Sequence, residues 1–117
     1  MAIVEIVGAF FSGVILFNAV PHVVRGICGK KHMTPFSPAS SALVNVLWGW
    51  INLVAAAVLA AVADFQHWEV QGFIAFGAGG LFTSVCLALL WSREGARLPW
   101  HKKASRTEGR QVPGQDI

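Results

Sequence analysis

The sequence predicts an all-α membrane protein with three transmembrane helices, at about residues 3–24, 38–63 and 70–92. Of the 117 residues, 55% are hydrophobic and 13% are charged, whereas about a quarter of the residues in a soluble domain carry a charge. Three stretches, residues 6–24, 33–63 and 70–92, contain no Asp, Glu, Lys or Arg. Since a helix needs about 20 apolar residues to cross a bilayer, each stretch is long enough to cross once.

The charged residues are divided unevenly between the two sides that three crossings create. Every Lys and Arg lies between the first two predicted helices or after the third, and these two segments share one side: Arg25, Lys30, Lys31, Arg93, Arg97, Lys102, Lys103, Arg106 and Arg110. The charges on the other side, Glu5, Asp64 and Glu69, are acidic. By the positive-inside rule, we expect a multi-pass protein of the bacterial inner (cytoplasmic) membrane, with its N-terminus outside and its C-terminus in the cytoplasm.

The first predicted helix has small residues at four-residue spacing. The pairs are Gly8 with Ser12 and Ala9 with Gly13, a pattern that lets two helix backbones approach closely in lipid. It predicts close helix packing, either within the chain or at a dimer interface. Because the only early charge is the acidic Glu5, and no small-x-small cleavage motif follows the apolar run, we expect this helix to be retained rather than removed as a signal peptide.

Polar residues gather toward the cytoplasmic end of the first helix. At 100° per residue, Asn18, His22 and Arg25 fall on one face. Pro21 has no N–H to donate to the carbonyl of Phe17, which predicts a kink and a free acceptor beside these side chains. The group is either a polar pocket or a set of side chains that extend to the lipid headgroups.

The first loop is basic and rich in turn-forming residues. Ser37 as N-cap and Pro38 at the first helical position predict that the second helix begins there. Cys28 and His32 have no further Cys nearby, so we expect no metal site and no cofactor. Cys86 is expected at membrane depth, so no disulfide with Cys28 is predicted.

The second helix carries a polar stripe. Ser41, Asn45, Trp48 and Asn52 follow one another at steps of four, three and four residues, with Gly49 beside them. Amides within a membrane span are unfavourable unless they are hydrogen-bonded, so the stripe should face protein, water or a ligand. Two interpretations remain open: the stripe holds the helices together, or it lines a site for a small solute.

The third helix again has close-packing residues, Gly80 and Ser84. Thr83 lies at the inner-leaflet depth where Asn18, His22 and Asn45 are also expected. The polar groups of all three helices are therefore predicted to converge in the cytoplasmic half of the membrane, either as a pocket or as a hydrogen-bonded core.

Residues 1–92 are expected to form one transmembrane domain, and residues 93–117 a basic, disordered cytoplasmic tail. Five basic residues surround Trp100: Arg93, Arg97, Lys102, Lys103 and Arg106. Such a segment binds anionic lipid with about 1 kcal/mol per basic residue. Because membrane topology explains these charges, no nucleic-acid partner is expected.

Two resemblances rest on short motifs in the first 55 residues. The motifs FNAVPH, GKKHMTPFS and NVLWGWINL resemble a group of small bacterial three-helix membrane proteins with no assigned activity. The order of an apolar helix, Pro21-His22, a basic loop and a Trp-bearing helix also resembles the bacterial half-transporters of the sugar-transporting SWEET class. That second resemblance implies a homodimer around a pore. The family has Gln where this chain has His22, and the third helix lacks the family's sugar-binding Asn.

The functional expectation is a small non-catalytic integral membrane protein, free-standing or an accessory subunit of a larger membrane complex. The alternative is a homodimeric small-solute transporter. An enzyme is not expected, because the sequence has no Ser-His-Asp pattern, paired carboxylates, phosphate-binding loop or set of metal ligands.

Overall fold

The computed structural model describes residues 1–93, 95 and 98–101 of the chain, and within them it is mostly helical. Its long helices are α1 (Ile3–Ile27), α2 (Ala42–Val62) and α3 (Val70–Trp91). All three are long and apolar enough to cross a membrane. The prediction of three helices of this kind is confirmed. Four of the basic residues assigned to the lipid surface lie outside the described residues: Arg97, Lys102, Lys103 and Arg106.

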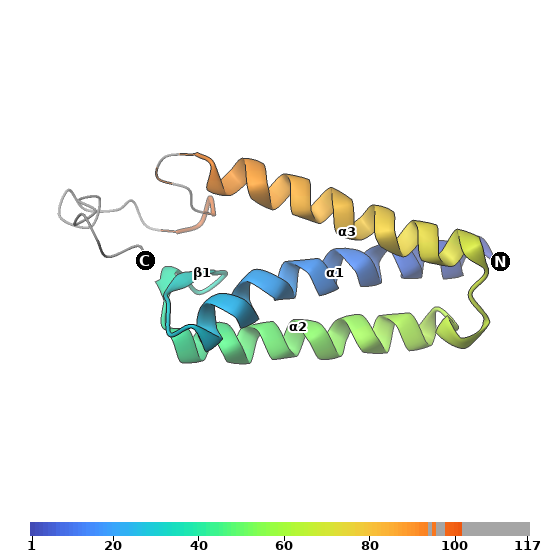
Figure 1. The fold of residues 1–117 in the computed structure, drawn as a ribbon, viewed down its shortest axis with the longest axis horizontal. Coiled ribbons are helices and arrows are strands. Elements are labelled where there is room, and N and C mark those ends of the chain that lie inside the picture. Colours follow the sequence, from blue (N-terminus) through green and yellow to red (C-terminus); the bar gives the residue numbers. More distant parts are fainter. Residues whose placement is uncertain (94, 96–97, 102–117) are drawn as a thin grey trace.

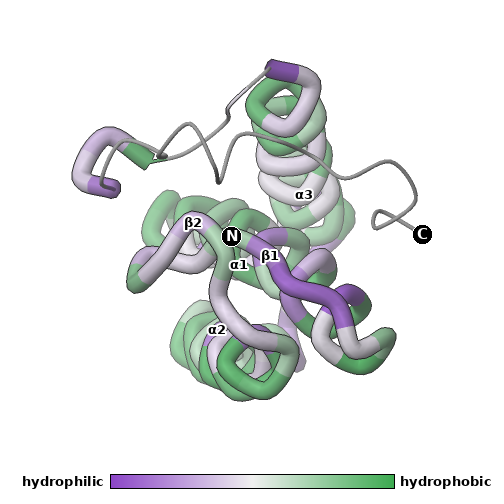
Figure 2. Tube along the Cα trace, turned by 90° about the vertical axis from the view of Figure 1, so that its left-hand side faces the viewer, coloured by the Kyte–Doolittle hydropathy of each residue, from purple (hydrophilic) through white to green (hydrophobic). Residues whose placement is uncertain are grey.

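Helix α1 is the central element. It packs along α2 on one side and along α3 on the other, whereas α2 and α3 contact each other little. Figure 1 shows α1 between its two neighbours, with α3 diverging from α1 toward the end where strand β1 lies. The view along the helices in Figure 2 shows the same order, with α2 and α3 on opposite sides of α1. The bundle is therefore open between α2 and α3.

The backbones of α1 and α3 touch at glycines. A Cβ atom on Gly13 would overlap the carbonyl of Phe76, and one on Gly79 would overlap the carbonyl of Phe10. A Cβ on Gly80 would lie 2.6 Å from the ring of Phe17. Since real Cβ atoms do not come this close, the crossing of α1 and α3 requires residues without side chains.

The α1–α2 contact uses small residues and one hydrogen bond along its length. The hydroxyl of Ser12 is buried and donates to the carbonyl of Ala56 at 2.8 Å. A Cβ on Gly8 would lie 2.7 Å from the Cβ of Ala63, and one on Gly49 would lie 2.5 Å from Val23. Ser84, in contrast, is exposed and donates within its own helix to the carbonyl of Gly80.

The connection from α1 to α2 differs from the prediction. Residues of the first loop form an antiparallel hairpin of β1 (His32–Thr34) and β2 (Ser37–Ser40). Helix α2 then begins at Ala42, and its N-cap is Ser41, whose hydroxyl accepts a hydrogen bond from the N–H of Val44 at 3.3 Å. The expected start at residue 38, with Ser37 as N-cap, is therefore wrong.

The physical reason lies in hydrogen bonds that hold residues 37–40 extended. The hydroxyls of Thr34 and Ser40 are paired at 2.5 Å across the hairpin, and the side chain of Asn45 donates to the carbonyl of Ser40 at 3.0 Å. At the other end of the loop, α1 extends to Ile27 rather than ending near residue 24, and it stays one helix through Pro21.

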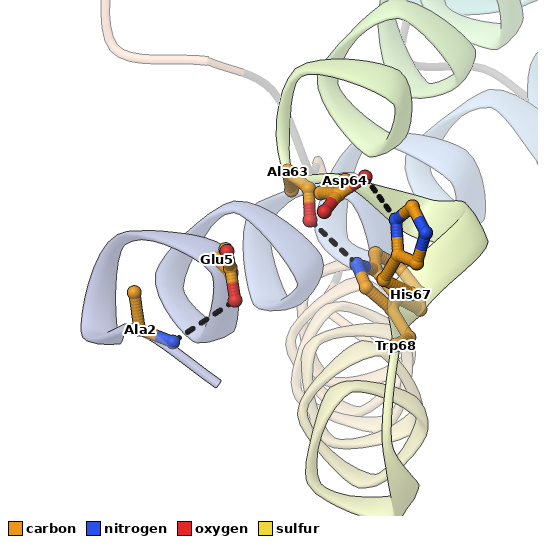
Figure 3. A network of polar contacts seen from close by, with 6 residues as sticks. All are labelled: Ala2, Glu5, Ala63, Asp64, His67 and Trp68. Atoms are coloured by element: carbon orange, nitrogen blue, oxygen red, sulfur yellow. Dashed lines mark hydrogen bonds and ion pairs between the residues drawn. The ribbon is translucent and has the colours of Figure 1, made fainter.

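The opposite end of the molecule, with the N-terminus and the α2–α3 connection, is held by local hydrogen bonds (Figure 3). The indole N–H of Trp68 donates to the carbonyl of Ala63 at 2.8 Å, and His67 pairs with the carboxylate of Asp64 at 2.8 Å. That hydrogen bond raises the pKa of the exposed His67 ring. Asp64 adopts the left-handed conformation (φ 58°) between α2 and the short 3-10 helix η1 (Phe65–His67). This compact turn makes α2 and α3 antiparallel.

Candidate functional site

The polar centre of the molecule is a pair of side chains from α1 and α2. His22 and Asn45 are both buried, with Asn45 completely inaccessible to solvent. The Nδ1 atom of His22 lies 2.8 Å from the Oδ1 atom of Asn45. The Nδ2 atom of Asn45 lies 3.0 Å from each of three carbonyl oxygens, those of His32, Ser40 and Ser41. The pair therefore joins α1, α2 and the hairpin.

This arrangement determines where the proton of His22 sits. The amide group of Asn45 must point its NH₂ at the three carbonyls, because rotating it would bring its oxygen against three acceptors. Its Oδ1 atom is then the acceptor facing His22, so Nδ1 of His22 must carry a hydrogen and donate it. In a neutral ring the lone pair is on Nε2, for which the described residues provide no hydrogen bond.

A second histidine, His32 of the hairpin, lies beside His22. The ring of His32 lies 5.3 Å from that of His22 and 4.4 Å from that of Trp91, between ring centroids. Burial, together with the neighbouring His22 and Arg25, lowers the pKa of His32 from 6.5 to about 4. His32 is therefore neutral at pH 7.

A cavity of about 110 Å³ lies beside these rings, at the end of the bundle where α3 diverges. Its lining comes from all three helices and the hairpin, and none of the lining residues is charged. The residues are Asn18, Pro21, His22, His32, Met33, Thr34, Pro35, Trp48, Leu87, Leu90, Trp91 and Leu98. The predicted polar residues Asn18 and His22 thus meet Trp48 at one cavity.

Other predicted site residues lie elsewhere. Asn52 donates from its side chain to the carbonyl of Trp48 in its own helix at 2.8 Å. Thr83 is buried on α3 without lining the cavity, and its hydroxyl has no partner among the described residues. Arg25 donates to the carbonyl of Lys31 and so holds the start of the loop. Ser41 serves as the cap of α2.

Sequence reasoning missed the contribution of His32, Thr34 and Trp91. His32 belongs to the loop predicted from its basic and turn-forming residues, and the hairpin brings it to His22. The polar–apolar–polar order of His32, Met33 and Thr34 before a turn containing Pro35 is a weak strand signal in the sequence. Trp91 is the last residue of α3, and its ring packs on that of His32.

Within the described residues, no group of three His, Cys, Asp or Glu side chains could hold a metal ion. Of the basic tail, Arg93 is described and is exposed. The indole N–H of Trp100 donates to the carbonyl of Pro35 at 2.9 Å, so residues 98–101 contact the hairpin.

Comparisons with protein-family models, with curated proteins and with solved structures find no match to this chain. The two resemblances drawn from its motifs therefore stay predictions, and proposals about function rest on the sequence and the geometry alone.

Proposed function

We propose that this chain is a non-catalytic, multi-pass protein of the bacterial inner membrane that serves as an accessory subunit of a larger membrane complex. The observation that carries the proposal is the open bundle: α1 is covered on both sides, whereas α2 and α3 each contact α1 and scarcely each other. Both outer helices therefore keep wide faces available for other membrane helices.

These faces contain small residues suited to close helix contact. Ala57 and Ala61 are exposed on α2, and they border a shallow groove that ends at Phe65. On α3, a Cβ atom added to Gly77 would meet no atom within 4 Å. Small side chains favour contact with another helix, because they let backbones approach and bring van der Waals contacts that lipid chains make less well.

The distribution of charge supports an orientation with the N-terminus outside. Arg25, Lys30 and Lys31 lie at the same end of the bundle as Arg93, while Glu5, Asp64 and Glu69 lie at the other. With the basic end in the cytoplasm, the tail that follows α3 would contact anionic lipid headgroups.

A homodimeric transporter is the second candidate. The cavity favours it, because Trp48, one of the stripe residues predicted to line a solute site, lies in its wall. Asn45, another residue of that stripe, is instead fully buried and hydrogen-bonded within its own chain, and Asn52 donates within its own helix. This engagement supports the accessory-subunit proposal over the transporter.

The test is the mass of the protein extracted at native expression level into nanodiscs, together with the proteins that copurify. The proposal expects a complex with a larger membrane protein, which Ala61→Leu or Gly77→Leu should dissociate. Val62→Leu, at an exposed position of α2 that is already large and lies about 100° around the helix from Ala61, is the matched control. A homodimer free of other proteins would overturn the proposal in favour of transport, and a monomer that captures nothing would contradict both.

A further inference from the structure

We propose that the cavity at the hairpin end binds a small uncharged aromatic molecule with a hydroxyl group, that is, a phenol or a quinol. The proposal goes beyond a role as subunit or transporter, because it assigns a ligand to this chain alone. It rests on the acceptor, the walls and the opening of the cavity.

The acceptor is Nε2 of His22. The side chain of His22 is 6% exposed, and its Nδ1–H is already used by Oδ1 of Asn45 at 2.8 Å. This hydrogen bond fixes the orientation of the His22 ring. The lone pair on Nε2 therefore has a fixed position on a residue that lines the cavity. Such an acceptor binds a hydroxyl donor.

The walls fit a single six-membered ring. Trp48 of α2 and Trp91 of α3 supply aromatic surfaces, and Leu87 and Leu90 supply aliphatic ones. The volume of about 110 Å³ is of the same order as a cavity of about 150 Å³ that holds one benzene molecule.

Because its lining residues carry no charge, the cavity favours a neutral ligand. None of its lining residues is Asp, Glu, Lys or Arg, and His32 is neutral at pH 7. A carboxylate or an ammonium ion would lose its hydration there without an oppositely charged side chain in the lining. The two histidines alone also make a poor metal site, because structural sites generally use four protein ligands and catalytic ones three.

The opening of the cavity indicates the route of entry. Residues of α2 and α3 both line the cavity, and these two helices scarcely contact each other, so no helix packing closes the bundle between them. A ligand dissolved in the bilayer can therefore reach it sideways. A free phenol and a membrane quinol share the required chemistry, and they differ in whether an isoprenoid chain adds affinity.

Binding is measured on the full-length protein in nanodiscs by tryptophan fluorescence, with 4-methylphenol and toluene as a pair that differs only in the hydroxyl. We expect saturable binding of 4-methylphenol about tenfold tighter than that of toluene, which is the ratio for one hydrogen bond of about 1.4 kcal/mol. The signal should diminish in Trp48→Phe and Trp91→Phe. It should persist in Trp50→Phe, since Trp50 is an exposed residue of α2 that does not line the cavity.

The variant His22→Asn tests the acceptor directly. An asparagine amide can take the place of Nδ1 and still donate to Asn45, while it has no atom at the position of Nε2. We expect this variant to keep the melting temperature of the wild type and to bind the two compounds equally. A benzoquinol with one isoprenyl unit distinguishes the sources: affinity above that of 4-methylphenol, after correction for partition into lipid, indicates a bilayer quinol, and equal affinity indicates a free phenol.

Equal binding of 4-methylphenol and toluene to the wild-type protein would overturn the proposal. So would a fluorescence response that Trp50→Phe reduces as strongly as Trp48→Phe, or an undiminished preference for the phenol in a folded His22→Asn protein. None of these results depends on whether the chain joins a larger complex, so this proposal and the accessory-subunit proposal can fail separately.

Discussion

Asn45 and Asn52 lie on the same stripe of α2, and they have different surroundings. Asn45 is fully buried, and both atoms of its amide are hydrogen-bonded, to α1 through His22 and to the hairpin through carbonyl groups. Asn52 is half-buried and donates to a carbonyl of its own helix. Between the two interpretations of the stripe, Asn45 therefore has the contacts of a residue that holds elements together, and Asn52 does not.

Replacing each asparagine by alanine should separate these roles. Asn45→Ala leaves Nδ1–H of His22 and the carbonyl of Ser40 without their partner, so we expect the free energy of unfolding to fall by about 1–3 kcal/mol. Asn52→Ala should change it by less than about 0.6 kcal/mol. The measurement is unfolding by titration with a denaturing detergent. Equal losses for the two variants would show that Asn45 is not the main connection.

The low pKa of His32 makes stability depend on pH. The pKa of the His32 ring is 6.5 in the unfolded chain and about 4 in the folded protein. As the pH falls, the unfolded state therefore binds a proton before the folded state does. The stabilising contribution is thus complete above pH 6.5 and is lost progressively between 6.5 and 4. We expect the melting temperature in detergent to fall more between pH 7 and 4.5 for the wild type than for His32→Gln.

His67→Gln is the control for this comparison. The pKa of His67 is raised by its hydrogen bond to Asp64, so its contribution is present below pH 6.5 and is lost as the pH rises through the folded pKa. Its removal should therefore not reduce the acid-induced loss of stability. If His32→Gln and the wild type respond alike, the burial of His32 has no effect on folding.

At the scale of elements, the crossing of α1 and α3 depends on where the glycines lie on α3. Gly79 faces the backbone of α1, whereas Gly77 faces open space. We expect Gly79→Ala to lower the free energy of unfolding by about 1–3 kcal/mol, because its methyl group forces the helices apart. Gly77→Ala should be neutral or stabilise by up to about 1 kcal/mol, since alanine favours a helix. Detergent titration again measures both, and a neutral Gly79→Ala would contradict the close crossing.

The long helices could be predicted from the sequence because their signal is local. The length of an uncharged run decides whether it can cross a bilayer, and the charged residues that end each run can be read directly from the sequence. The hairpin could not be predicted in the same way. Ser37-Pro38 is a good local start for a helix, and the hydrogen bonds that hold Ser40 extended come from Thr34 and from Asn45. Ser41, one turn before Asn45, is therefore the N-cap of α2 in place of the predicted Ser37.

The candidate site was predictable in part for the same reason. Helical spacing placed Asn18 and His22 on one face, and depth placed them near the cytoplasmic end. Their neighbours His32 and Trp91 come from other elements, and their positions follow from the hairpin and from the tilt of α3. Tertiary contacts of this kind leave no periodic pattern in the sequence.

At the scale of the whole molecule, the two native cysteines allow the orientation to be tested. Cys28 is exposed just after α1. With Cys86 changed to alanine, we expect a membrane-impermeant maleimide to label Cys28 in inverted vesicles and not in intact spheroplasts. Gln66→Cys, placed in the exposed α2–α3 connection of a chain lacking both native cysteines, should give the opposite result. Labelling of Cys28 in intact spheroplasts would reverse the proposed orientation.

The central position of α1 also has a consequence for assembly in the membrane. Because α2 and α3 lie on opposite sides of α1, the pair of α1 and α2 with its hairpin can form completely while α3 is still being synthesised. Helix α3 then docks on a glycine surface that no other helix has occupied, and nothing already formed needs to separate. Two polypeptides divided within the Asp64–Glu69 turn would therefore have the contacts needed to find each other in a bilayer.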